Sequence, residues 1–233
     1  MRGYAVALGA LALLSACANP EDVKQLQEAN RALQAKVAEL EKKVDAAAKA
    51  PPARPQVDPN KVYDIPVGNS PFKGPANAPV VLVEWADYQC PFCAQVPALV
   101  DQLLAAYPND LKFVYKQMPL PMHSLAMPAS KAALAAGKQG KYWEMHTLLY
   151  ANQRALQPDK LKGYAEQLGL DVPKWEQDLA SPEIQQQIDA EMAQARQAQV
   201  SGTPSLFING KRAMNRSVDG LKQAIDEALK AKG

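Results

Sequence analysis

Two cysteines separated by two residues, in Cys90-Pro91-Phe92-Cys93, have the types and spacing needed for thiol chemistry. A thiolate is the nucleophile of thiol–disulfide exchange, and the backbone amides and dipole of a helix N-terminus stabilise it. Apolar residues at helical spacing follow the pair, so a helix is predicted to begin at Cys90. Cys90 would then be the exposed, attacking thiol. Cys93, one turn further along the same face, would be buried and would resolve the mixed disulfide.

Two other uses of such a pair are possible. Paired cysteines form half of many zinc sites, but the second half is missing, because His123 and His146 are 23 positions apart rather than about three to five. A structural disulfide is disfavoured because so short a ring is strained, and strained disulfides are the labile ones. We therefore predict no metal and no bound cofactor, and we interpret both histidines as structural or incidental rather than catalytic.

The elements around the pair predict an α/β domain. Residues 80–86 are apolar and β-branched, as in a strand buried on both faces, and residues 111–116 alternate as a second strand. Residues 205–208 predict a third strand, which a two-residue turn, Asn209-Gly210, joins to its return strand. Ser217 is a good N-cap for a closing helix.

The segment from about 117 to 200 is longer than one crossover requires. It predicts helical pieces, one near 130–150 and another opened by Ser181-Pro182. We therefore expect a helical subdomain inserted into a small α/β sheet.

Two motifs together resemble a known family. Val83-Glu84-Trp85 before the cysteine pair, and the run Gly202-Thr203-Pro204-Ser205-Leu206-Phe207-Ile208-Asn209-Gly210, are similar to motifs of the DsbA-like thioredoxin family over roughly residues 60–233. The resemblance implies a thioredoxin-like fold interrupted by a helical domain. It also implies that Pro204 is cis and faces the cysteines, and that Thr203 offers its backbone to an extended substrate.

The resemblance extends to the acid at Glu84, with one departure at Phe92. Glu84 matches an acidic position behind the active site that may assist proton transfer at the second cysteine in some members; the alternative is a partly exposed acid at a strand end. The best-known strong oxidant of the family has a histidine at the position of Phe92. A phenyl ring offers the thiolate neither charge nor a hydrogen bond, which disfavours strong oxidising power.

The N-terminal segment is typical of a bacterial export signal that ends in Cys17. A positive start is followed by an apolar run over residues 4–14, too short for the roughly 20 residues that cross a bilayer. Leu14-Ser15-Ala16-Cys17 resembles a lipobox, which makes residues 1–16 the signal peptide and Cys17 the acylated residue. An ordinary secretory signal with an incidental cysteine is the alternative.

Lipidation at Cys17 would anchor the protein to a membrane, facing the periplasm, because several acyl chains give stable anchoring. In Gram-negative lipoproteins an aspartate after the cysteine marks inner-membrane retention. Neither Ala18 nor Asn19 is acidic, so the outer membrane is favoured over the inner.

Residues 17–49 are predicted to form a lipid anchor followed by a helical coiled-coil stalk. Residues 21–49 lack glycine and proline, and apolar positions alternate spacings of three and four, as in a heptad repeat. The seam consists of Val23, Leu26, Asn30, Leu33, Val37, Leu40, Val44 and Ala47, in which Asn30 is the polar exception. Asn30 at an a position and the pair Lys36 and Glu41 favour a homo-oligomer, a dimer or a trimer, and lipidation at Cys17 would make its helices parallel. A single solvated helix is the alternative.

Residues 50–60 are rich in proline and predict a semi-rigid linker to the catalytic domain at 61–233. The formal net charge of +2 becomes +1 without Arg2, with 25 basic and 24 acidic side chains, which argues against nucleic acid as a partner.

The sequence as a whole predicts an extracytoplasmic thiol:disulfide oxidoreductase. Its partners would be exported polypeptides with thiols or disulfides, a membrane redox partner, and the membrane itself. Thr203 and the oligomeric stalk match relatives that reduce or isomerise disulfides, which favours that direction over dithiol oxidation. A stalked, non-enzymatic chaperone is a second hypothesis. A coiled-coil spacer is a third, although it leaves most of the chain unexplained.

Overall fold

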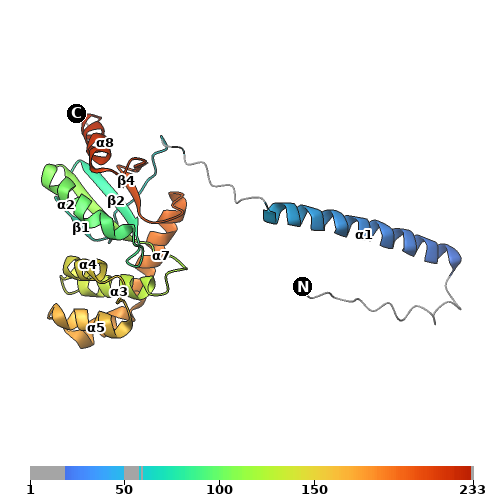
Figure 1. Ribbon diagram of the computed structural model, residues 1–233, viewed down its shortest axis with the longest axis horizontal. Coiled ribbons are helices and arrows are strands. Elements are labelled where there is room, and N and C mark those ends of the chain that lie inside the picture. The colour runs from blue at the N-terminus through green and yellow to red at the C-terminus, as the bar shows by residue number, and fades with distance from the viewer. Residues whose placement is uncertain (1–18, 50–57, 59, 232–233) are drawn as a thin grey trace. The chain divides into compact units, whose positions relative to one another are not determined.

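The computed structural model describes residues 19–49, 58 and 60–231 (Figure 1). The chain divides into two units, one containing the described residues up to 49 and the other those from 58 onward. The predicted signal peptide 1–16, Cys17 and most of the linker 50–60 lie outside the described residues. No helix in the described part of the chain is long and apolar enough to cross a membrane.

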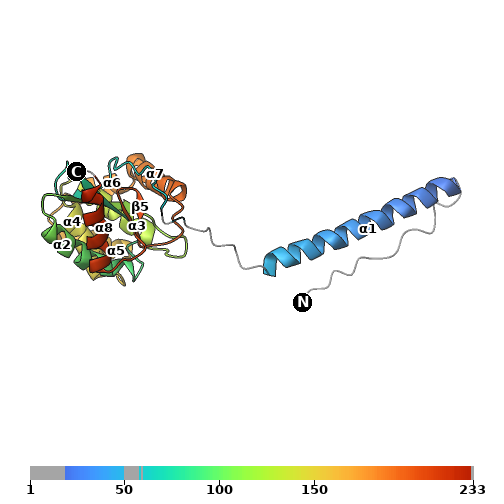
Figure 2. The same ribbon diagram turned by 90° about the horizontal axis from the view of Figure 1, so that it is seen from above.

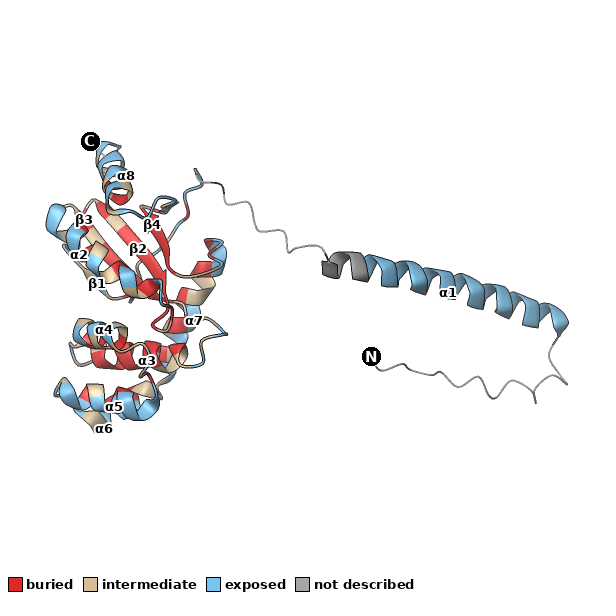
Figure 3. Cartoon of the chain, in the orientation of Figure 1, coloured by how far each residue is buried: buried red, intermediate tan, exposed pale blue. Residues whose placement is uncertain are grey.

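The first unit is the helix α1, Pro20–Lys49. Every side chain described on it, through Val44, is exposed (Figure 3). The apolar heptad positions are included, with exposed fractions from 42% at Val23 to 74% at Leu26. The predicted helix is confirmed, and no side chain among the described residues covers its apolar stripe.

The second unit is built on a five-stranded mixed sheet in the order β1-β3-β2-β4-β5. The central strands β2 and β3 are parallel, and the other neighbours are antiparallel. The strands are β1 Phe72–Lys73, β2 Val80–Ala86, β3 Leu111–Gln117, β4 Ser205–Ile208 and β5 Lys211–Arg212. The predicted turn at Asn209-Gly210 is present, with positive φ values of 46° and 81°.

Helices cover both faces of this sheet (Figure 2). On one face, α2, Val96–Ala106, and α8, Val218–Lys230, pack on even-numbered residues of β2 such as Leu82. On the other face, α7, Pro182–Gln197, packs on odd-numbered residues such as Trp85. Because side chains alternate along a strand, this arrangement explains why the even-numbered and the odd-numbered residues of β2 are both mostly apolar. The predicted N-cap of α8 is confirmed, since the Ser217 hydroxyl accepts a hydrogen bond from the Gly220 amide at 3.1 Å.

Four further helices lie between β3 and α7, and we call them the helical subdomain. They are α3 Ala126–Gly137, α4 Tyr142–Ala151, α5 Pro158–Gln167 and α6 Val172–Leu179. The single helix predicted near 130–150 is wrong, because the chain turns between α3 and α4. Gly140 adopts φ of 75° in this turn, and Tyr142 packs so closely on Gly137 that an added Cβ would lie 3.3 Å from the Tyr142 Cβ.

Candidate active site

The cysteine pair lies between β2 and α2, where the chain leaves the sheet. The Cys90 amide donates to the Asp87 carbonyl at 3.1 Å, and the Cys93 amide donates to the Cys90 carbonyl at 3.1 Å. A 3₁₀ turn over Cys93–Gln95 leads into α2, so helical structure begins three residues after Cys90, and the α-helix begins at Val96. Cys90 therefore precedes the first helical turn, and Cys93 lies within it.

The two thiols differ in burial less than the sequence predicts. Both are free cysteines; Cys93 is 0% exposed and Cys90 is 5% exposed, whereas Phe92 between them is 67% exposed. The expectation of an exposed Cys90 is therefore wrong, although Cys90 remains the more accessible of the two. The cover comes from a distant segment, because the Cys90 Sγ donates to the Thr203 carbonyl at 3.5 Å.

That segment is the loop before β4, where the Thr203-Pro204 peptide bond is cis. The Ser205 hydroxyl donates to the Gly202 carbonyl at 2.7 Å, and the Arg216 Nη1 donates to the Pro204 carbonyl at 2.9 Å. These bonds hold the loop opposite the cysteines. The structure thus brings together the two motifs that carry the family resemblance, although 113 residues separate Cys90 from Thr203.

Glu84 lies on β2, on the face that packs against α2, and is 2% exposed. It is therefore not the partly exposed acid of the alternative interpretation. Burial raises the pKa of this carboxyl well above its usual value, and the nearby Cys90 raises it further. The pKa of the Cys93 thiol is also raised, first by burial and then by Glu84. In the described part of the chain, no hydrogen bond satisfies the Glu84 Oε1.

Sequence reasoning missed the side chains that hold the active-site loop. The buried Asp87 carboxylate accepts hydrogen bonds from the Gln89 amide at 2.7 Å, the Leu120 amide at 2.8 Å and the His123 Nδ1 at 2.8 Å. From the turn that follows α4, the Gln153 side-chain amide nitrogen donates to the Tyr88 and Cys90 carbonyls at 2.8 and 2.9 Å. The polar character of Asp87 and Gln89, directly before Cys90, could have pointed to their role. No local sequence pattern marks Leu120, His123 or Gln153 as partners of this loop.

His146 is buried among aromatic rings, where its Nδ1 lies 3.1 Å from the Tyr88 hydroxyl. Burial, followed by the charge of Lys73, lowers the pKa of His146 to about 3. The ring is therefore neutral near pH 7, in keeping with a structural role. No cluster of three or more His, Cys, Asp or Glu side chains in the described residues is arranged to hold a metal ion.

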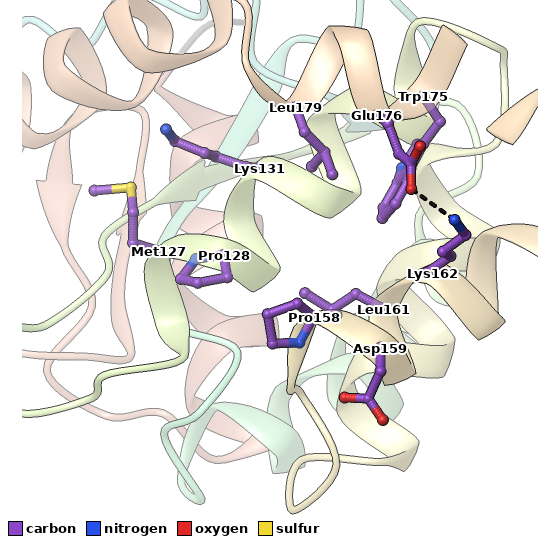
Figure 4. Close-up of a pocket in the computed structure, with 10 residues that line it drawn as sticks. All are labelled: Met127, Pro128, Lys131, Pro158, Asp159, Leu161, Lys162, Trp175, Glu176 and Leu179. Atoms are coloured by element: carbon purple, nitrogen blue, oxygen red, sulfur yellow. Dashed lines mark ion pairs between the residues drawn. The ribbon is translucent and has the colours of Figure 1, made fainter. Parts of the chain in front are cut away.

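A separate cavity of about 500 Å³ lies in the helical subdomain (Figure 4). Its wall includes Trp175 and Leu161, and the ion pair between Lys162 and Glu176, at 2.9 Å, lies at its edge. Neither cysteine nor the cis-proline loop lines it. This cavity is therefore not part of the thiol site.

A mixed sheet of this order, with a Cys-X-X-Cys pair before a helix and a cis-proline opposite, defines the thioredoxin-like thiol:disulfide oxidoreductases. Residues 67–227 match the sequence family described as Thioredoxin, and the chain belongs to that family. Its fold is the thioredoxin-like fold that solved DsbA-like thiol–disulfide proteins share.

Solved structures support this fold. A thioredoxin-like oxidoreductase from Silicibacter pomeroyi DSS-3 is 32% identical, with a TM-score of 0.65 over 70% of this chain and 94% of that chain. BdbD from Bacillus subtilis is 21% identical, with a TM-score of 0.63 over 69% of this chain and 93% of that chain. Wolbachia pipientis alpha-DsbA2 is 22% identical, with a TM-score of 0.60 over 68% of this chain and 86% of that chain.

Curated relatives include much longer proteins. The Na(+)/H(+) antiporter NhaA 1 of Salinispora arenicola is 40% identical over 159 residues, which are 67% of this chain and 24% of the antiporter. NhaA of Herminiimonas arsenicoxydans is 35% identical over 141 residues, 60% of this chain and 22% of that protein. The chain thus spans about a quarter of the length of these relatives.

Proposed function

We propose that this protein exchanges disulfides with exported polypeptides outside the cytoplasm, through Cys90 as attacking thiol and Cys93 as resolving thiol. The observation that carries the proposal is the contact between the Cys90 Sγ and the Thr203 carbonyl at the cis-proline loop. This contact puts the more accessible thiol beside backbone that an extended client could pair with. Cys93, fully buried behind it, can be reached by Cys90 but not by a client.

In the reducing direction, the Cys90 thiolate attacks one sulfur of a client disulfide, and the other client sulfur leaves as a thiolate that takes a proton. Cys93 then loses its proton and attacks the Cys90 sulfur. The Cys90–Cys93 disulfide forms, the second client thiol is released, and the client has gained two electrons. A membrane redox partner that supplies two electrons would restore the dithiol. If a client thiol attacks first, Cys90 is freed and the client disulfide is isomerised.

Glu84 is proposed to accept the Cys93 proton during this attack. Burial of the carboxyl and of the thiol raises both pKa values, so the pair favours at most one negative charge. The proton moves from the state with a carboxylate at Glu84 beside a neutral Cys93 thiol, and the transfer leaves a neutral carboxyl beside the Cys93 thiolate. A proton passed between the two would avoid placing both negative charges in one apolar site.

Reduction or isomerisation is proposed in preference to dithiol oxidation. Phe92 offers no positive charge to a thiolate, and Thr203 matches members of the family that reduce or isomerise. A parallel homo-oligomer held by residues 21–49, with lipid at Cys17 on the periplasmic face of the outer membrane, would place several catalytic domains near one client. The exposed apolar stripe on α1 supports association.

Insulin reduction by wild type and by Cys90→Ala tests the exchange activity. Wild type should precipitate the insulin B chain and the variant should not; equal activity would leave only a binding or chaperone role.

Equilibration with glutathione buffers then tests the direction of electron transfer, since a strongly oxidising potential would mean a dithiol oxidase. Limiting iodoacetamide should label Cys90 of the reduced protein before Cys93, and the opposite order would reverse their roles.

A further inference from the structure

A small cavity lies beside the reactive pair, between the start of α2 and the cis-proline loop. Its volume is about 300 Å³, and its apolar walls come from Phe92, Val96, Leu99, Pro204 and Leu206. This is the lower end of the size range of ligand pockets, roughly 300 to 1,000 Å³. The cavity therefore suits a side chain or two of a peptide bound at the cis-proline loop, where the Thr203 carbonyl contacts the Cys90 sulfur.

Among the described residues, Arg216 is the one charged side chain that lines this cavity, and Gln95 is the other polar one. The Arg216 Nη1 donates to the Pro204 carbonyl at 2.9 Å, which fixes the guanidinium beside the loop. No carboxylate in the described part of the chain forms an ion pair with Arg216, and the residue is exposed. A guanidinium has five N–H donors in a planar fork, so donors remain for a carboxylate.

We propose that Arg216 makes the enzyme prefer clients with an acidic side chain adjacent to the exchanging cysteine. The inference rests on the proposed function and names the client chemistry that the same site selects. With the client cysteine at Cys90, the methylene groups of a neighbouring glutamate contact Phe92 and Leu99. Its carboxylate reaches Arg216. The cavity thus combines an apolar wall with one fixed cation, which complements an acidic side chain better than a neutral or basic one.

Short peptides that carry a 2-thiopyridyl disulfide on their only cysteine provide the test. Attack by Cys90 on the peptide sulfur forms the mixed disulfide and releases a neutral chromophore, so the rate is read directly. Two series place Glu, Gln or Lys immediately before or after the cysteine. In one series or both, we expect the Glu peptide to react about two- to fivefold faster than the Gln peptide at low salt. The advantage should shrink in about 0.5 M sodium chloride.

Variants at Arg216 separate recognition from loop positioning, because the Glu-to-Gln rate ratio within one variant cancels any change in the loop. Arg216→Gln should bring the ratio to about one, Arg216→Lys should retain part of it, and Arg216→Glu should favour the Lys peptide. Arg196→Gln is the matched control. Arg196 is exposed on α7, which covers the opposite face of the sheet, so the ratio should not change.

Equal rates for the Glu and Gln peptides in wild type, or a ratio that survives Arg216→Gln, would overturn the inference while leaving the exchange activity intact. Release that is as fast in Cys90→Ala as in wild type would instead overturn the proposed function. The two failures are therefore distinguishable in a single set of measurements.

Discussion

At the active site, the carboxyl of Glu84 links the chemistry to the stability of the domain. It is 2% exposed, one of its oxygens has no hydrogen bond in the described part of the chain, and burial raises its pKa. The folded chain therefore binds this proton more tightly than the unfolded chain. Its contribution to stability is present below the ordinary glutamate pKa of about 4.3 and is lost as the pH rises towards the raised value.

We predict that Glu84→Gln stabilises the domain at pH 7 by about 1–3 kcal/mol, because ionisation of Glu84 favours the unfolded chain at this pH and an amide cannot ionise. The gain should shrink towards pH 4, where the native carboxyl is also neutral. Urea unfolding across this range gives the measurement. Glu191→Gln is the contrasting variant: Glu191 is also buried, but it accepts hydrogen bonds from Ser70, Gln187 and the Gln117 amide, so its replacement should destabilise.

The same Glu84→Gln variant should slow release of product from the mixed disulfide by about 10²-fold, with attack by Cys90 nearly unchanged. The expectation follows from the proposed transfer of the Cys93 proton to Glu84. Single-turnover kinetics separates the two steps. Release at the wild-type rate would leave Glu84 without a role in proton transfer.

Phe92→His should form the Cys90 thiolate at lower pH and make the disulfide more oxidising. Phe92 is 67% exposed, so the substitution does not disturb the core, and an imidazolium can stabilise the adjacent anion. A fall of about one pH unit in the thiolate titration corresponds to roughly 1.4 kcal/mol and about 30 mV in potential. Thiolate absorbance and glutathione equilibria measure the two quantities, with Phe92→Leu as the uncharged control. If neither quantity moves relative to Leu, the electrostatic argument is wrong.

At the scale of elements, the loop between β2 and α2 is held in place by the connection that follows β3. Asp87 supplies the contact, since its buried carboxylate accepts from the Leu120 amide and from His123 as well as from its own loop. The active-site conformation thus depends on the segment leading into the helical subdomain as well as on the sheet.

We predict that Asp87→Ala lowers the free energy of unfolding by about 2–4 kcal/mol, because three donors lose their acceptor. Asp87→Asn keeps one acceptor oxygen and should cost less. Urea unfolding measures both. Asp101→Ala is the control: that side chain is 65% exposed and pairs only with Lys73, at 3.2 Å, so its loss should cost under about 0.5 kcal/mol. Equal losses for Asp87→Ala and Asp101→Ala would contradict the anchoring role.

The elements that sequence reasoning located are those with local signals. The apolar run of β2, the Asn209-Gly210 turn and the Ser217 cap each depend on a few neighbouring residues. The break between α3 and α4 had a local signal too, in Gly137 and Gly140, but the apolar pattern on both sides hid it. The burial of Cys90 had none, because its cover comes from Thr203.

At the scale of the whole molecule, the two units obtain their stability in different ways. The catalytic domain has apolar clusters on both faces of its sheet. The helix α1 has no buried side chain among those described, although its a and d positions are apolar apart from Asn30. Isolated helices in water are marginal, and a stripe of this length gains stability when it is buried against other helices. A second copy of α1 would supply the matching stripe.

We predict that residues 18–233 without lipid form a parallel dimer or trimer, whereas a chain starting at Pro51 is a monomer. Valine at a positions, leucine at d positions and Asn30 at an a position favour two strands over three. Light scattering over a concentration series gives the mass of each. Leu33→Asp, at a d position, should dissociate the oligomer, and Ala35→Asp, at the outer f position, is the matched control that should not. Monomers for both lengths at high concentration would contradict the coiled coil.

If the stalk brings catalytic domains together for isomerisation, removing residues 18–50 should abolish rescue of scrambled ribonuclease and leave insulin reduction unchanged.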